Sequence, residues 1–482
     1  MKEFHDYRGP YMRSKGHSVK MMRNVFLALT PIIGFACYKN GIFPYLEGKT
    51  DLYGCIYPLL FILVTMLTSY LTEACYHFVF MKKRGSALKE VMVNSYALFP
   101  GLFLSLIMPI NTPIELMMLG AFIATIFGKM IYGGFGYNIF NPALIGSLFI
   151  ISIYGSVITS HGGYFNPYEL DTISHATPLS NVAVVDGIGT YQTLVEPYGN
   201  LFDFFFGTIP GAMGEVSVLL CLLAFLFLAF TRTIKVKIPI LYIATVFGMT
   251  TIISSLNGVG MWYPLFQIFS GGLFFGAIFM ATDPVTTPVT PTGQALFGIC
   301  LGILTVILRY LTPYPEGVLT SILAMNMLVF LFDKIGSRVR GRAILKAASI
   351  TIIVILAIGV AFGISKKYDQ KASTNGNKDN NFELLETKQV GEKTIYIATQ
   401  KGNGGVIKAE VTFEKGVATT YVILEHRETP SYYSLVEKED YVSKLLQGQN
   451  QLDKVDTVSG ATISSTALKK LLINLKEVAN EK

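Results

Sequence analysis

Stretches of about 20 apolar residues recur along most of the chain, and they limit its fold more than any other feature, since an α-helix needs about 20 such residues to cross a bilayer. Only 15% of the residues are charged, whereas soluble proteins carry about 25%. The pattern predicts an α-helical polytopic membrane protein. Eleven stretches lie near residues 24–42, 55–80, 91–110, 113–131, 141–157, 211–230, 237–255, 264–281, 294–311, 317–333 and 346–365.

Basic residues between these stretches predict the orientation of the chain, because cytoplasmic flanks of membrane spans collect Lys and Arg. Four basic clusters fall on one side if ten spans are followed by one anchoring span. Residues 130–231 contain no Lys or Arg, which places the long loop 158–210 on the other side. We expect a cytoplasmic N-terminus and an extracytoplasmic C-terminal part. The clusters lie at residues 2–23, 82–89, 232–237 and 334–346.

The C-terminal part has a different composition. Residues 367–482 carry 16 basic and 16 acidic side chains, so the whole net charge of +7 belongs to the first 366 residues. This charge is typical of membrane flanks and not of a nucleic-acid-binding surface, so no nucleic-acid partner is expected. We divide the chain into a membrane domain at 1–345, an anchoring span at 346–366, a polar linker at 367–381 and a small α+β domain at 382–482.

Local patterns within the last domain predict its elements. Alternating apolar and polar residues favour strands, and apolar residues at helical spacing favour an amphipathic helix. We expect strands at 393–399, 406–413 and 417–424, and helices at 433–447 and 463–478.

Two Pro/Thr-rich breaks indicate an internal repeat in the membrane domain. Residues 108–113 and 280–288 both begin with Met, and each precedes a Gly-containing apolar helix about five spans from the other. Two five-helix halves of inverted topology, with broken helices near the midplane, would produce this pattern. The alternative is that Pro and Thr simply mark the ends of spans.

A heptapeptide occurs twice, as Asp171-Thr-Ile-Ser-His-Ala-Thr177 and as Asp456-Thr-Val-Ser-Gly-Ala-Thr462, with five shared positions. A Ser/Thr-rich turn used twice is the alternative explanation. The second copy leads directly into the predicted helix at 463–478. A helix N-terminus presents unpaired amides and a positive dipole end, which suits a phosphate, and Gly460 allows close approach of the backbone. The residues therefore predict an anion site at this helix end.

These motifs resemble a known family. The sequence ending at Thr462 is similar to the attachment motif of FMN-binding subunits in Rnf and sodium-pumping NADH:quinone reductase complexes, where a flavin transferase joins FMN through its phosphate to the last Thr. Residues 1–345 resemble the D subunit of Rnf and the B subunit of the sodium pump, through residues 133–143 and 280–286. Residues 346–482 resemble the Rnf G subunit, through residues 404–407 and 424–430.

The resemblance implies FMN covalently attached at Thr462 and at Thr177, which would be anchors and not acid–base catalysts. His175 stands where the motif has Gly, which leaves attachment at Thr177 open. The remaining motif residues implied to surround the flavin phosphates are Asp456, Ser459, Gly460, Ala461, Asp171, Ser174 and Ala176. His426, Glu428 and Thr429 are candidates for flavin contacts, unless they form a solvated hairpin end.

Three ionisable residues are candidates for an ion pathway, because such groups are rare inside membranes and usually functional. Glu73 and His77 are one helical turn apart near the inner end of the second stretch, where long side chains also extend to the interface. Asp283 lies in the second break and would serve an ion or a flavin. The five cysteines show no CxxC spacing, so we expect neither an iron–sulfur cluster nor another metal in this chain.

We expect a flavin-carrying subunit of an Rnf-type ion-translocating oxidoreductase in the bacterial plasma membrane, which relays electrons through FMN and couples them to Na⁺ or H⁺ translocation. Its implied partners are iron–sulfur and membrane subunits and the flavin transferase, so it would not be active alone. The membrane domain is a candidate for a further, non-covalent flavin. Two alternatives stay open, namely a non-pumping extracytoplasmic flavin reductase and a small-solute channel or carrier with a flavin-binding tail.

Overall fold

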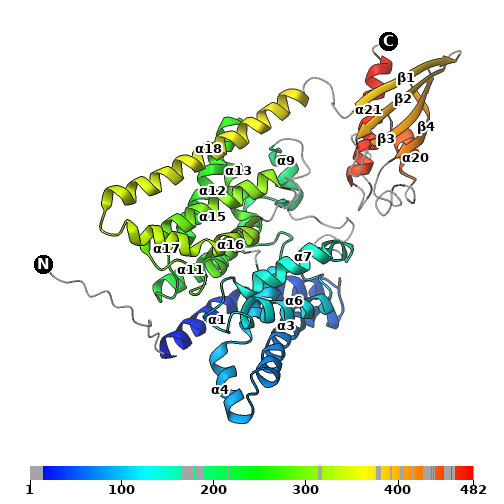
Figure 1. Ribbon diagram of the computed structural model, residues 1–482. Helices are drawn as coiled ribbons and strands as arrows, with labels where there is room; N and C mark the ends of the chain where they lie inside the picture. Colours follow the sequence, from blue (N-terminus) through cyan, green and yellow to red (C-terminus); the bar gives the residue numbers. More distant parts are fainter. Residues whose placement is uncertain are drawn as a thin grey trace. The chain divides into compact units, whose positions relative to one another are not determined.

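The chain forms two compact units in the computed structural model, the first reaching to Tyr368 and the second starting at Asp369 (Figure 1). The structure describes residues 15–161, 163, 178–179, 188–214, 217–312, 317–375, 382–390, 393–401, 406–414, 417–426, 436, 438, 440–449, 458 and 462–480.

The first unit is built from apolar helices over its described residues. Their bounds are α1 (Lys15–Cys37), η1 (Tyr38–Ile42), α2 (Phe43–Leu46), α3 (Leu52–Val79), α4 (Gly85–Ser95), α5 (Phe99–Ile107), α6 (Ile114–Thr125), η2 (Ile126–Met130), α7 (Pro142–Ser160), α9 (Tyr191–Leu194), η3 (Glu196–Tyr198), α10 (Leu201–Phe206), α11 (Val218–Phe230), α12 (Lys237–Leu256), α13 (Trp262–Phe269), α14 (Leu273–Phe275), η4 (Gly276–Met280), α15 (Pro291–Leu311), α16 (Gly317–Met327), α17 (Val329–Arg338) and α18 (Ala343–Asn375).

Each of the eleven apolar stretches contains helix, but not each is one straight span. Within the described residues, five helices are long and apolar enough to cross a membrane, or up to eight if each bent pair counts once. The number of ten spans plus an anchor therefore stays a prediction. The bent pairs are α4 with α5 at 40°, α13 with α14 and η4 at 61°, and α16 with α17 at 58°.

Two of the three bends have local backbone causes. Tyr96, between α4 and α5, is left-handed with φ 53°, and Gly271, between α13 and α14, has φ +68°. A residue in the left-handed backbone conformation ends an α-helix, and glycine adopts this conformation without a Cβ clash. Among the described residues of the same unit, the π-helical turns η1, η2 and η4 follow or interrupt helices. Such turns occur frequently at functional sites.

The two halves of the first unit share a packing order. α3 contacts the bent pair α4–α5 and α6, as α12 contacts the bent pair α13–α14 and α15. α6 contacts α7, as α15 contacts α16 and α17. The division into two five-helix halves and their opposite orientation in a membrane stay predictions. Within the predicted outer loop 158–210, Leu179, Ile188 and Leu194 are buried in the core of this unit.

Over its described residues, the second unit is a four-stranded antiparallel meander in the order β1-β2-β3-β4 with helices α20 and α21 beside it (Figure 1). After an exposed first residue, β3 alternates buried and half-buried residues, as its sequence predicted. Helix α21 packs on β2 and β3 and buries Leu468, Leu471, Leu472 and Leu475. The bounds are β1 (Phe382–Val390), β2 (Lys393–Lys401), β3 (Val406–Glu414), β4 (Val417–His426), α20 (Tyr441–Gln447) and α21 (Thr462–Asn480).

Several predicted boundaries need correction. Strand β1 was missed, because it is a mostly exposed edge strand and therefore lacks apolar alternation. Within the predicted helix 433–447, Val436 and Lys438 are helical and α20 covers Tyr441–Gln447, while Asp440 between them is left-handed with φ 44°. Helix α18 continues to Asn375, so the first part of the predicted linker 367–381 is helical.

Candidate flavin site and membrane polar cluster

Helix α21 begins at Thr462, the last residue of the second heptapeptide. Val458 is held against α21, because its amide donates to Ser465 Oγ at 3.1 Å. Val458 and Ser465 are both buried, and Ser465 is 0% exposed. The first amides of a helix have no intrahelical acceptor. The end of α21 at Thr462 thus presents a positive dipole end, which favours an anion such as a phosphate.

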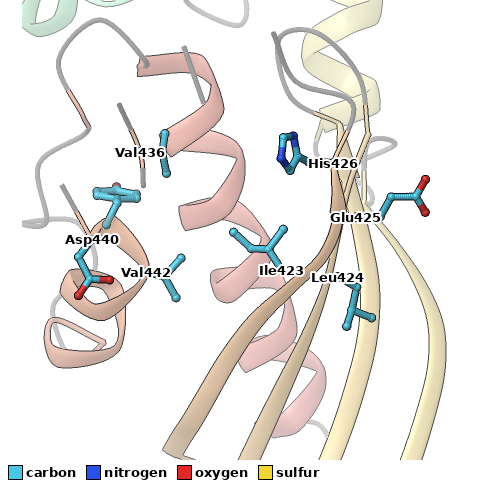
Figure 2. A pocket seen from close by; sticks show the side chains of 8 residues that line it. Ile423, Leu424, Glu425, His426, Val436, Asp440 and Val442 are labelled. Atoms are coloured by element: carbon cyan, nitrogen blue, oxygen red, sulfur yellow. The ribbon is translucent and has the colours of Figure 1, made fainter. Parts of the chain in front are cut away.

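A cavity of about 450 Å³ lies between the end of β4 and the segment around α20 (Figure 2). This volume is within the usual range for small-molecule sites. Figure 2 shows Ile423 and His426 projecting toward Val436 and Val442, whereas Glu425 projects away. Its lining residues are Ile423, Leu424, Glu425, His426, Val436, Asp440, Tyr441 and Val442.

A β-bulge sets the direction of His426. Ala409 pairs with Ile423 and Lys408 pairs with Glu425, so Leu424 is an extra residue in β4. A bulge re-aims the side chains that follow it. His426 therefore pairs with Ile407, which is 0% exposed on the inner face. Strict alternation after Ile423 would have put the next inward position at Glu425.

Many predicted flavin-site residues lie outside the described residues, and their roles stay predictions. Thr462 is described as the first residue of α21, and His426 is a cavity-lining residue. The residues that the structure does not describe are Asp171, Ser174, Ala176, Thr177, Asp456, Ser459, Gly460, Ala461, Glu428 and Thr429.

Glu73 belongs to a buried polar cluster in the membrane unit. Its Oε2 lies 2.6 Å from Lys129 Nζ, and the same Nζ donates to the Ser95 carbonyl at 2.6 Å. Glu73 is 0% exposed and Lys129 is 2% exposed. The Glu73 carboxylate is thus buried within the protein and paired with Lys129. Sequence reasoning missed Lys129, although a basic residue inside the apolar stretch 113–131 was the available signal.

His77 completes this cluster. Its Nε2 lies 3.9 Å from Glu73 Oε1 on the same helix. Glu73 and His77 line a cavity of about 430 Å³, together with Glu90, Asn94 and Tyr96 among others. The structure thus brings two predicted ion-pathway residues to one polar cavity.

Asp283 lies elsewhere, in the loop between η4 and α15. Thr286 Oγ1 donates to Asp283 Oδ2 at 3.2 Å, and Thr287 Oγ1 donates to the Asp283 carbonyl at 2.9 Å. Asp333 of α17 holds the other end of this loop, since it accepts hydrogen bonds from both the amide and the hydroxyl of Thr290 at 2.8 Å. The Pro/Thr-rich break is therefore an ordered loop, in which the Asp283 carboxylate bonds its own turn.

The two motifs that carry the resemblance of the membrane domain meet in space. Asn141 Nδ2 donates to Met280 Sδ at 3.3 Å across 139 residues of sequence. This contact joins the start of α7 to the end of η4.

Comparison with known proteins decides the family. The model of the NQR2, RnfD, RnfE family matches residues 7–341, which include both motifs and the polar cluster. The chain belongs to this family. A second family model, that of the FMN-binding domain, matches residues 402–476, which include β3, β4, α20 and the start of α21. The predicted combination of a D-like membrane part with a G-like FMN-binding part is thereby confirmed.

Individual relatives within the NQR2, RnfD, RnfE family agree. The chain is 33% identical over 329 residues to the D subunit of the proton-translocating ferredoxin:NAD(+) oxidoreductase complex of Clostridium ljungdahlii, covering 67% of this chain and 92% of that protein. It is 30% identical over 328 residues to the D subunit of the Na(+)-translocating ferredoxin:NAD(+) oxidoreductase complex of Acetobacterium woodii, covering 67% and 91%. The B subunit of the Na(+)-translocating NADH-quinone reductase of Chromohalobacter salexigens is 32% identical over 274 residues, covering 55% and 63%.

Proposed function

We propose that this chain is the flavin-carrying membrane subunit of an Rnf-type ion-translocating oxidoreductase. The observation that carries the proposal is the union, in one chain, of a membrane unit of the NQR2, RnfD, RnfE family with an FMN-binding domain. The D subunits of two ferredoxin:NAD(+) oxidoreductase complexes are relatives over most of their length. The chain would therefore act with other subunits, which supply the iron–sulfur clusters and the electron donor, and not alone.

FMN would be attached through its phosphate to Thr462 by a flavin transferase. Two features fit FMN, namely the helix end at Thr462 and the cavity of about 450 Å³ beside His426. When bound, the flavin ring supplies the electron-carrying chemistry, while the protein supplies binding and orientation. Thr462 would hold the phosphate and His426 would contact the flavin, with Glu428 and Thr429 as further contacts. Asp456, Ser459, Gly460 and Ala461 would complete the attachment motif.

A second FMN would be attached at Thr177, with Asp171, Ser174 and Ala176 in the same motif positions. A covalent bond keeps a cofactor from diffusing away, which matters on the extracytoplasmic side. Both FMN groups would lie on the extracytoplasmic side if the N-terminus is cytoplasmic and ten spans, in two inverted five-helix repeats, are followed by one anchoring span. The host membrane would be the bacterial plasma membrane.

The membrane unit would couple electron transfer to the movement of Na⁺ or H⁺. Glu73 and His77 would belong to the ion pathway because they line a polar cavity within an apolar unit. Asp283 would act at the second break, near the contact of Asn141 with Met280. A further non-covalent flavin would bind within this membrane unit.

Mass spectrometry of the two Thr-containing peptides tests the flavin assignment. The full-length chain would be produced together with its flavin transferase, and FMN is expected on the peptide that contains Thr462. An unmodified Thr462 in that material would overturn the covalent attachment. A non-pumping flavin reductase is excluded if proteoliposomes of the complete complex take up Na⁺ or H⁺ when an electron donor is added.

One structural feature favours a second candidate, a small-solute channel or carrier. Three bent helix pairs resemble the broken helices of transporters. Liposomes that contain the chain alone would then release a small solute without any electron donor. An absence of such flux, together with donor-dependent ion uptake by the complete complex, supports the oxidoreductase.

A further inference from the structure

Equivalent helices in the two halves of the membrane unit carry matching polar pairs. Thr125 and Lys129 are four residues apart at the end of α6 and in η2, and Thr305 and Arg309 are four residues apart on α15. Thr125 Oγ1 lies 2.9 Å from Ser69 Oγ of α3. Thr305 Oγ1 lies 2.6 Å from Tyr242 Oη of α12. The two pairs thus occupy corresponding places in the packing.

Both cations bind the end of the first segment of a bent helix pair. Lys129 Nζ donates at 2.6 Å to the carbonyl of Ser95, the last residue of α4. Arg309 donates at 2.5 Å to the Gln267 carbonyl and at 3.3 Å to the Ser270 carbonyl, at the end of α13. Positive groups are stabilised at helix C-termini. Each half therefore uses a buried cation to hold its bend.

The two halves differ at the position of the Glu73 carboxylate. Glu73 follows Ser69 by four residues on α3, and Val246 follows Tyr242 by four residues on α12. Both Glu73 and Val246 are 0% exposed. Since the second half binds its helix end through a cation with valine at this position, holding the bend does not require the carboxylate. Glu73 has another role.

Only one oxygen of Glu73 is engaged within the described part of the chain. Oε2 binds Lys129, whereas Oε1 has no hydrogen-bond partner among the described residues. Oε1 lies 3.9 Å from His77 Nε2, and both residues line the cavity of about 430 Å³. A buried oxygen without a partner is costly, and a carboxylate oxygen is a ligand that hard cations prefer. Glu73 is therefore an incomplete cation ligand that faces a cavity.

We propose that Glu73 is an exchange site, at which a small monovalent cation displaces the ammonium group of Lys129. The incoming cation adds one positive charge, which repels Lys129 from the carboxylate, while the Ser95 carbonyl retains the ammonium nearby. Return of Lys129 to Glu73 expels the cation. Lys129 is thus an internal substitute for the transported ion. This inference rests on the proposed ion pathway and specifies its chemistry.

The test measures the chemical reactivity of Lys129 in the full-length chain in lipid nanodiscs. Lysines are acetylated with acetic anhydride at increasing NaCl, while choline chloride keeps the ionic strength constant, and mass spectrometry quantifies each site. Lys39 is the internal control, because it is also 2% exposed but donates to the Ile209 carbonyl. We expect the Lys129-to-Lys39 acetylation ratio to rise several-fold with Na⁺. A ratio that does not change with Na⁺ overturns the proposal.

Two substitutions sharpen the test. In Glu73→Gln, the Lys129-to-Lys39 ratio should be high without Na⁺ and should not respond to it. In Glu73→Asp, which keeps a carboxylate and guards against misfolding of the first variant, the response to Na⁺ should remain. A rise in Glu73→Gln equal to that of the original chain contradicts the exchange at Glu73. Because no electron donor or flavin enters this assay, its failure is distinguishable from failure of the proposed electron-transfer function.

Discussion

Glu73 and Lys129 are 56 residues apart in sequence and form an ion pair inside the apolar membrane unit, with 2.6 Å between Glu73 Oε2 and Lys129 Nζ. Neither partner reaches the surface, since their side chains are 0% and 3% exposed. A buried ion pair contributes little net stability but is costly to break from one side. The pair therefore links the packing of α3 on η2 to the chemistry of a polar cavity.

Removal of Lys129 alone should destabilise the membrane unit. Lys129→Met leaves the Glu73 carboxylate buried and unpaired, and such a loss costs about 3–5 kcal/mol. The double variant Glu73→Gln/Lys129→Met should recover most of this free energy of unfolding, because it removes both charges. Thermal unfolding in detergent measures the effect, and Lys82→Met on the exposed loop is the control. Equal destabilisation by the single and double variants would contradict a direct pairing energy.

Thr462→Ala should abolish covalent FMN on the C-terminal domain, because alanine lacks the hydroxyl group that forms the ester with the FMN phosphate. In-gel flavin fluorescence of the denatured chain measures the bound FMN, and the Thr177→Ala/Thr462→Ala double variant should show none. Thr419→Ala is the matched control, since Thr419 lies on the exposed face of β4. Full fluorescence in the double variant would place the flavin on another residue.

His426 and Glu425 are neighbours on opposite sides of β4, and their substitutions should differ (Figure 2). His426→Ala should shift the reduction potential of the domain-bound flavin by about 30 mV or more, which equals about 1.4 kcal/mol for a two-electron couple. Glu425→Ala should leave the potential unchanged, because its side chain projects away from the cavity. Potentiometric titration of the full-length flavoprotein measures both. Equal shifts would indicate a general charge or folding effect and not a contact.

Asp333→Asn should loosen the second break. Asp333 Oδ1 accepts from the amides of Val289 and Thr290 and from the Thr290 hydroxyl, and hydrogen bonds to a charged group contribute about 1.5–3 kcal/mol each. We expect faster amide exchange at the start of α15, measured by hydrogen–deuterium exchange mass spectrometry. Lys334→Gln, at the adjacent position on α17, is the control. Unchanged amide exchange at residues 289–293 would show that the hydrogen bonds of Asp333 do not stabilise this loop.

Local sequence patterns determined much of this protein. The apolar stretches identified the membrane unit, and the alternation at 406–413 identified β3 almost to the residue. A polar motif before an amphipathic run predicted a helix from 463, and α21 begins one residue earlier, at Thr462. These features depend on neighbours within one or two turns, so the printed order of residues contains them. Strand β1 was missed because an exposed edge strand needs no apolar face.

Contacts between distant segments were decided only by the tertiary structure. Nothing local predicts that Lys129 meets Glu73, or that Asn141 meets Met280 across 139 residues. The inward direction of His426 depends on an extra residue in the register between β3 and β4. Periodicity states which face of an element is apolar, whereas packing and strand register select the partner on that face. The family was therefore readable from the sequence, and the geometry of the candidate ion site was not.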